Sequence, residues 1–248
     1  MSEPHISLAA ETIETVFGLP ITNSLLMTWL VMAGLIALSL VSSRRISLVP
    51  GNVQSVLEIV IEGLYELFRS VVGVVYVDKF FPLLATLFFF IVVSNWSGLL
   101  PGVGNSIGFL EEESHVIIPL LRGPTADLNT TFALAIVSVI SIQYFGVRSL
   151  GGSYFKKFIN MTNPIMFGVG LLEIVSELSR IISFAFRLFG NIFAGEVLLV
   201  VMASLMPLLA PLPFLGLELF VGLIQGLVFS MLTAVFLNMA TISHEEHS

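Results

Sequence analysis

The sequence has no cysteine and few charged residues. The absence of cysteine excludes disulfide bonds, thiolate metal sites and iron–sulfur clusters held by cysteine. Charged side chains make up 11% of the 248 residues, against roughly a quarter in soluble domains, while 56% of the residues are hydrophobic. Ten basic residues against 17 acidic ones give a net charge of −7, so we expect no nucleic-acid partner. This composition is typical of an integral membrane protein.

Histidine is also scarce, and its positions exclude two further classes of membrane protein. The chain has four histidines, none of which lies in an apolar stretch: His5, His115, His244 and His247. A membrane cytochrome needs axial haem ligands within its spanning helices, and an intramembrane protease of the Ser–His type needs a buried base. We therefore predict no cofactor, no metal site and no catalysis on a bound substrate.

Long apolar stretches dominate the rest of the sequence. A helix needs about 20 apolar residues to cross a hydrocarbon core roughly 30 Å thick. Stretches of about this length or longer occur at about 24–42, 80–100, 128–147, 164–206 and 212–240. The intervening stretch 53–77 instead places charges on one helical face, at Glu58, Glu62, Glu66 and Arg69. The sequence predicts an all-α integral membrane protein, a single domain over residues 1–248, with about five transmembrane helices plus one amphipathic surface helix.

The fourth apolar stretch is too long for an upright helix. As one helix, 164–206 would be about 64 Å long, roughly twice the thickness of the hydrocarbon core. The next stretch, 212–240, is also long, and Pro207, Pro211 and Pro213 lie around the connection. We therefore expect the last two helices to form a long, tilted hairpin over 164–240, joined by a proline-rich turn.

The basic residues indicate how the chain is oriented. Arginine and lysine gather after the first and third apolar stretches, at Arg44, Arg45, Arg69, Lys79, Arg148, Lys156 and Lys157. The loop 101–126 between them is acidic at 111–113 and contains one basic residue, Arg122. By the positive-inside tendency, the two basic loops are cytoplasmic. We therefore predict that the N-terminal segment 1–23 is outside and that the C-terminus is cytoplasmic.

The fourth stretch carries its polar residues on one helical face, at Glu173, Glu177, Arg180, Arg187 and Asn191. Arg187 is the most informative, because an arginine at bilayer depth costs about 2.5–3.5 kcal/mol on insertion scales. Glu196 is nine residues further on, which places it on the opposite side of the helix and about 13 Å along the axis. The two side chains cannot pair locally, so we interpret Arg187 as functional. A structural network with amide side chains is the alternative.

The last apolar stretch adds two polar residues to this set. Glu218 and Gln225 are seven residues apart and share a helical face. A folded-back hairpin would place Glu196 beside Glu218, and Gln225 beside Arg187. Two neighbouring carboxyls can form a water-lined path for proton uptake, because such a pair holds at least one proton near neutrality. Alternatively, Glu196 is an interfacial side chain that reaches water.

The run Arg187–Asn191, with the sequence Arg-Leu-Phe-Gly-Asn, is followed by Ala194–Glu196, with the sequence Ala-Gly-Glu. Together they closely resemble subunit a of the F-type ATP synthase. The segments Ser94–Pro101 and Pro124–Asn129 are similar to this family as well, and Gln225 resembles the glutamine of its last helix. The first 20 or so residues are the only part without a recognisable counterpart.

The resemblance implies a proton-conducting stator subunit of a rotary ATP synthase, one part of a large hetero-oligomer. Its last hairpin would pack against a rotating ring of c subunits, each of which bears a membrane-embedded carboxyl. Arg187 would face those carboxyls and separate two half-channels. Glu196 and Glu218 would line the outer half-channel, and Asn191 and Gln225 would support the arginine.

The chain also departs from part of the family. Some members carry histidine at the positions of Gly195 and Glu218, so a histidine relay is not available here and the proton path must rely on carboxyls and water. The region 53–77 resembles the part that contacts the b subunits of the peripheral stalk. The expected location is the plasma (inner) membrane of a bacterium. A secondary transporter and a purely structural membrane subunit are the rival classes, and the choice between H⁺ and Na⁺ stays open.

Overall fold

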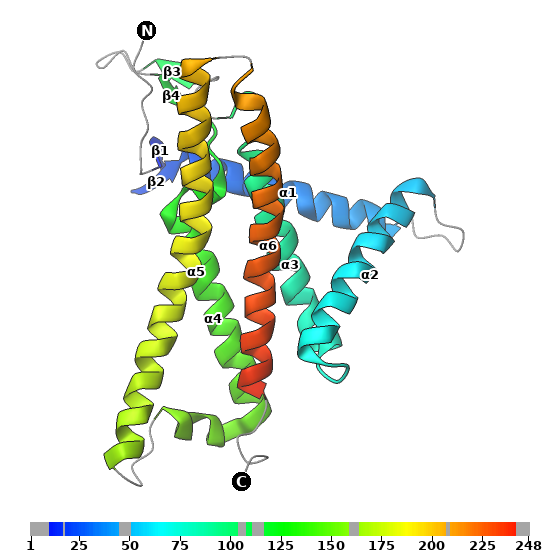
Figure 1. Cartoon of the computed structure of the whole chain (residues 1–248), viewed down its shortest axis with the longest axis vertical. Coiled ribbons are helices and arrows are strands. Elements are labelled where there is room, and N and C mark those ends of the chain that lie inside the picture. Colours follow the sequence, from blue (N-terminus) through cyan, green and yellow to red (C-terminus); the bar gives the residue numbers. More distant parts are fainter. Residues whose placement is uncertain are drawn as a thin grey trace.

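The computed structural model describes residues 10–16, 18–44, 51–103, 108–110, 117–158, 164–206 and 209–241, which are mostly helical (Figure 1). Within them the chain forms six α-helices: α1 Asn23–Arg44, α2 Asn52–Val72, α3 Val77–Ser97, α4 Leu128–Leu150, α5 Pro164–Leu205 and α6 Pro211–Thr241. Two 3-10 helices flank α4: η1 at Pro124–Ala126 and η2 at Gly151–Lys157. The four histidines, the acidic run at 111–113 and Pro207 lie outside the described residues.

Five of these helices, all except α2, are long and apolar enough to cross a membrane. The predicted all-α membrane fold with one additional amphipathic helix is therefore confirmed. In α2, Leu64 and Phe68 are buried in a cluster with side chains of α3 and α6, whereas Glu58 and Glu62 are exposed. The helix ends at Val72, short of the predicted 77, because the chain turns at the following glycine, which has a φ of 81°.

The last two helices form the predicted long hairpin. With 42 residues, α5 is about 63 Å long, and α6, with 31 residues, is about 47 Å long. They lie side by side and run in opposite directions (Figure 1). Pro211 and Pro213, expected in the connecting turn, instead lie in the first turn of α6, where a helix leaves its N–H groups unpaired in any case.

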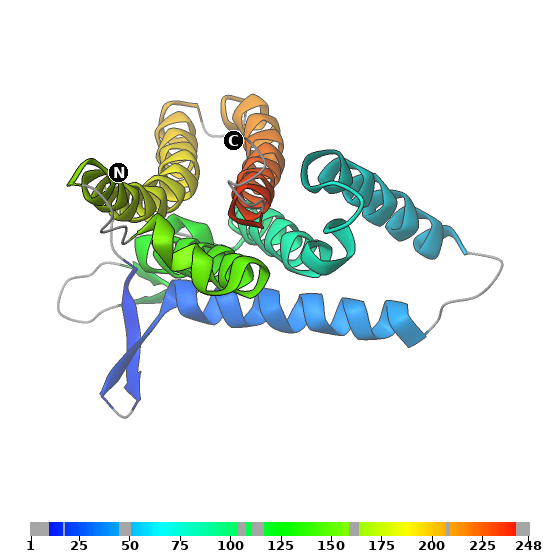
Figure 2. The same cartoon turned by 90° about the horizontal axis from the view of Figure 1, so that it is seen from below.

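The direction of α1 shows why the hairpin can be so long. Viewed along the longest axis of the molecule, α5 and α6 are seen nearly end-on while α1 is seen lengthwise (Figure 2), and Figure 1 shows the same crossing. With 22 residues, α1 is about 33 Å long, which matches a hydrocarbon core when the helix is upright. Helices that cross α1 in this way then lie strongly tilted, so their extra length fits within the bilayer.

Glycines bring α6 close to α3. A Cβ on Gly226 would lie 2.6 Å from the Val92 side chain, and one on Gly222 would lie 3.0 Å from the Cβ of Asn95. This close approach is the helix packing that small residues four positions apart permit in membranes. Because this face of α6 packs against α3, α5 must pack against a different face of α6.

Two short β-hairpins are absent from the sequence prediction. Strand β1 (Thr12–Val16) pairs with β2 (Leu19–Thr22) through a turn at Gly18, which has a φ of 82°. Strand β3 (Gly108–Leu110) pairs with β4 (Ile117–Pro119). The first hairpin therefore forms much of the segment 1–23, and the second lies in the loop between α3 and α4.

Candidate functional site

Arg187 lies in the middle of α5, and its side chain is exposed. Its Nη2 donates a hydrogen bond of 3.2 Å to the Ser183 hydroxyl, one helical turn away. None of the ion pairs among the described residues includes Arg187. The guanidinium is therefore oriented by a neutral neighbour while its charge is left available to another molecule.

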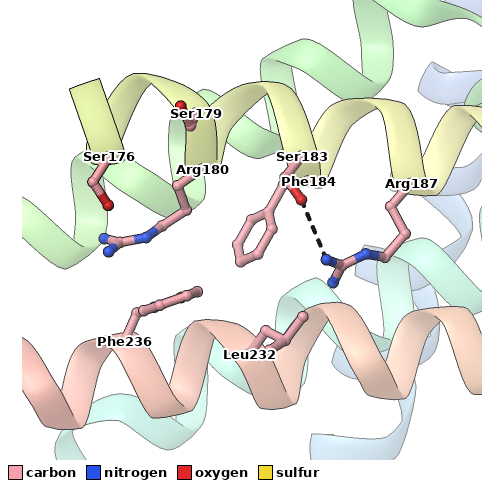
Figure 3. Close-up of a pocket in the computed structure, with 8 residues that line it drawn as sticks. All are labelled: Ser176, Ser179, Arg180, Ser183, Phe184, Arg187, Leu232 and Phe236. Carbon is pink, nitrogen blue, oxygen red and sulfur yellow. Dashed lines mark hydrogen bonds between the residues drawn. The ribbon is translucent and has the colours of Figure 1, made fainter.

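A pocket of about 260 Å³ extends from Arg187 along α5 toward its N-terminal end (Figure 3). Three serines of α5 line the pocket: Ser176, Ser179 and Ser183. Arg180 and side chains of α6 complete the lining. The serines follow at intervals of three and four residues, which places them on the helical face of Arg187. Sequence reasoning missed them, although their spacing could have been read from the sequence.

The second arginine of the pocket, in contrast to Arg187, is neutralised within the chain. Arg180 forms a 2.7 Å ion pair with Glu177, and its guanidinium lies 3.8 Å from the centre of the Phe236 ring on α6. Glu173, one turn before Glu177, forms an ion pair with Lys157 of η2 at 2.6 Å.

An amide pair joins the two helices of the hairpin one turn beyond Arg187. The Asn191 Nδ2 donates a 2.6 Å hydrogen bond to the Oε1 of Gln225, whose side chain is only 3% exposed. The sequence placed Gln225 beside Arg187, whereas its hydrogen-bond partner is Asn191. This bond fixes the distance between α5 and α6 beside the arginine.

The structure places the Glu218 side chain of α6 against the turn of α5 that carries Glu196. The carboxyl of Glu218 packs so closely over Gly195 that a Cβ on this glycine would overlap it, and Gly195 directly precedes Glu196. Glu218 is only 6% exposed. Glu196 also has a partner that the sequence did not suggest, because the Nη2 of Arg122 lies 3.8 Å from its Oε2.

Side chains of α3 and η1 hold the part of α6 that carries Glu218. Asn95 donates a 2.9 Å hydrogen bond to the carbonyl of Gly222, and Thr125 donates one of 2.7 Å to the Asn95 Oδ1. The Trp96 indole N–H donates to the carbonyl of Leu219 at 3.0 Å. The turn of α6 next to Glu218 is thereby held by α3, and η1 in turn orients the Asn95 side chain.

The fold and the site together define a polytopic membrane protein whose tilted hairpin presents an exposed arginine between a hydroxyl-lined pocket and a pair of acidic side chains. A family model described as ATP synthase A chain matches residues 25–238. ATP synthase subunit a from Gloeobacter violaceus is 36% identical over 225 residues, which cover 91% of this chain and 86% of that protein. The chain therefore belongs to the ATP synthase A chain family.

Proposed function

We propose that this chain is the membrane stator subunit of a bacterial rotary ATP synthase and that it conducts protons through two half-channels. Arg187 is the centre of this proposal. Its guanidinium is exposed on the hairpin and has no carboxylate within ion-pair distance among the described residues. A permanent charge of this kind in a membrane helix calls for a carboxylate from a neighbouring subunit.

The partner carboxylate is that of a c subunit as the ring turns past α5. A cation within about 4–6 Å favours the ionised form of a carboxyl, so each arriving ring carboxyl loses its proton in front of Arg187. Arginine suits this role because its guanidinium keeps its charge at every physiological pH and can bind a carboxylate with two hydrogen bonds. The same charge repels a proton that would otherwise leak directly from one half-channel to the other.

The two half-channels approach Arg187 from opposite directions along α5. On the outer side, Glu196 and Glu218 provide proton-binding groups, beginning about 13 Å from the arginine along the helix axis. On the cytoplasmic side, the serine-lined pocket reaches back to Ser176, about 16 Å in the other direction. Because the two paths are offset along α5, a proton crosses the whole membrane only by travelling on the ring. Asn191, which is hydrogen-bonded to Gln225, lies between the two paths.

The remaining expectations complete this assignment. The chain forms one membrane domain in a large hetero-oligomer, with its hairpin 164–240 against the c ring and the region 53–77 near the b subunits of the peripheral stalk. Its N-terminus faces the outside of the plasma (inner) membrane and its C-terminus faces the cytoplasm. The nucleotide chemistry takes place in other subunits, so this chain is not itself an enzyme.

Arg187→Lys tests the proposal in the assembled ATP synthase. A lysine keeps a positive charge but lacks the planar fork, and it can lose its proton. We expect ATP-driven proton pumping into membrane vesicles to be abolished, while Arg148→Lys, at the exposed end of α4, retains it. Retained pumping in Arg187→Lys would count decisively against the assigned role.

A second variant separates the rival classes. A purely structural subunit predicts that Arg187→Ala leaves ion flux intact in every complex that assembles. A secondary transporter predicts ion flux without c subunits, so flux by the chain alone in vesicles would favour that class. The stator role predicts no coupled flux in either case.

A further inference from the structure

Arg180 is a second arginine in the pocket that leads to Arg187, and the proposed proton path assigns it no role. Both side chains line this pocket (Figure 3). Arg180 precedes Arg187 by seven residues, or about 10 Å along α5, and lies on the same helical face. The two arginines differ in access, because Arg187 is exposed whereas only 12% of the Arg180 side chain is.

Glu177 and Phe236 cover Arg180. The Nη1 of Arg180 donates a 2.7 Å hydrogen bond to the Oε2 of Glu177. On its other side the guanidinium lies 3.8 Å from the centre of the Phe236 ring of α6. The carboxylate neutralises the charge and the ring covers a face of the guanidinium. Arg180 is thus masked from a carboxylate of another subunit.

A neighbouring ion pair keeps Glu177 available to Arg180. Lys157 of η2 lies 2.6 Å from the Oε1 of Glu173 but 3.9 Å from the Oε1 of Glu177. Lys157 is therefore bound mainly by Glu173, and Glu177 keeps its closer contact with Arg180. The two cations and two carboxylates that meet at the N-terminal end of the pocket have a net charge of zero. Glu177 is only 8% exposed, so salt screens its charge little.

The tilt of α5 makes this masking important for a rotating ring. A ring carboxyl travels in the plane of the membrane, so a helix that lies strongly tilted presents its residues to that carboxyl one after another (Figure 2). During ATP-driven pumping, a carboxyl that leaves Arg187 on the side of the serine pocket takes up a proton there. This step brings it near the turn that carries Arg180. A bare guanidinium within about 4–6 Å would keep the carboxyl ionised and oppose the uptake.

We propose that Glu177 is a positioning residue of the cytoplasmic half-channel, which masks Arg180 so that the ring carboxyl can gain and lose its proton there. Along the described length of α5, Arg187 alone then presents an unpaired guanidinium to the ring. This inference rests on the proposed function and adds a requirement to it. The half-channel needs one bare arginine at its inner end and a neutral wall beyond it.

The test measures ATP-driven proton uptake per assembled ATP synthase, in vesicles whose cytoplasmic face is outward. We expect Glu177→Gln to lower the rate at least about fivefold, because the uncovered guanidinium would hold each ring carboxylate through a charge-assisted hydrogen bond. Glu14→Gln, which removes an exposed carboxylate of β1, is the matched control and should pump normally. Normal pumping by Glu177→Gln would overturn the inference.

Two double variants separate the effect of charge from that of packing. Glu177→Gln combined with Arg180→Gln removes both charges and should recover most of the rate. Glu177→Gln combined with Arg180→Lys keeps an uncovered cation in the half-channel and should stay slow. Equal rates in the two double variants, whether both fast or both slow, would overturn the inference.

The pH dependence of pumping gives a measurement that loosened packing alone would not change. Because a bare cation favours the ionised ring carboxyl, proton uptake in Glu177→Gln requires a more acidic medium on the cytoplasmic face. The rate of this variant relative to the unsubstituted complex should therefore rise as the external pH is lowered. A ratio that does not change with pH would contradict the masking role. These outcomes leave the proposed function untouched, since it fails only if Arg187→Lys continues to pump.

Discussion

Gly195 leaves the space that the Glu218 carboxyl occupies, so Gly195→Ala should damage the outer half-channel. A Cβ at this position would overlap the carboxyl, whereas a Cβ on Gly168 of the same helix would meet no atom within 4 Å. In a helix interior, alanine is more favourable than glycine by about 1 kcal/mol. Gly168→Ala keeps this gain. In Gly195→Ala the Glu218 carboxyl, which is the far end of a flexible side chain, must move aside, so stability changes little while a proton-binding group is displaced.

The two variants should therefore have similar stability, within about 1 kcal/mol of each other. The effect on transport should be larger, because the methyl group displaces a proton-binding carboxyl by on the order of 1 Å, and displacements of this size can cost about 100-fold. We expect ATP-driven pumping per complex to fall at least tenfold in Gly195→Ala and to be unchanged in Gly168→Ala.

The assay combines proton uptake by vesicles that contain the purified ATP synthase with the thermal inactivation of the same preparations. A Gly195→Ala complex that is as stable as Gly168→Ala and pumps normally per complex would refute the reasoning, whereas equal stability with reduced pumping is the expected result. Glu218 would then have another position open to it at no cost, and its place over Gly195 would have no functional meaning.

Three further variants test other parts of the account. Gly226→Ala, which places a Cβ 2.6 Å from the Val92 side chain, should destabilise the complex by about 1–3 kcal/mol in thermal denaturation; unchanged stability would contradict the close packing of α3 and α6. Glu218→Gln should slow proton pumping without stopping it, and a normal rate would remove Glu218 from the path. Ser183→Ala removes the 3.2 Å hydrogen bond to Arg187, worth about 1 kcal/mol, so pumping should fall less than about tenfold; complete loss would show that the hydroxyl does more than orient the guanidinium.

The spanning helices were predictable because each one alone must be an apolar stretch long enough to cross the bilayer. Uninterrupted apolar stretches identify α1, α3, α4, α5 and α6, and the length of α5 alone requires a tilt. The ends of the helices depend on local backbone geometry instead. Gly73 ends α2 early through its positive φ, and Pro211 begins α6 instead of lying in the turn before it.

Arg187 and Asn191 could be found in the sequence because polar groups are costly in an apolar helix. Their exact partners could not be found from the sequence. Arg187 and Asn191 are one helical turn apart on α5. The hydrophobic pattern does not fix the register of two helices closely enough to show which of the two contacts Gln225. Arg122 reaches Glu196 across 74 residues of sequence through a loop whose course no periodicity predicts. The three serines of the pocket are small and neutral, so their position on the helical face carries a weak signal.

The account depends most on where the Arg187 guanidinium points in the assembled complex. An experimental structure of the whole ATP synthase in a lipid bilayer would measure its distance to the nearest c-ring carboxyl. The account predicts that this distance falls within about 6 Å for the subunit facing α5, the range over which such a pair perturbs ionisation. A guanidinium paired with an acid of its own chain, or turned toward lipid, would contradict it.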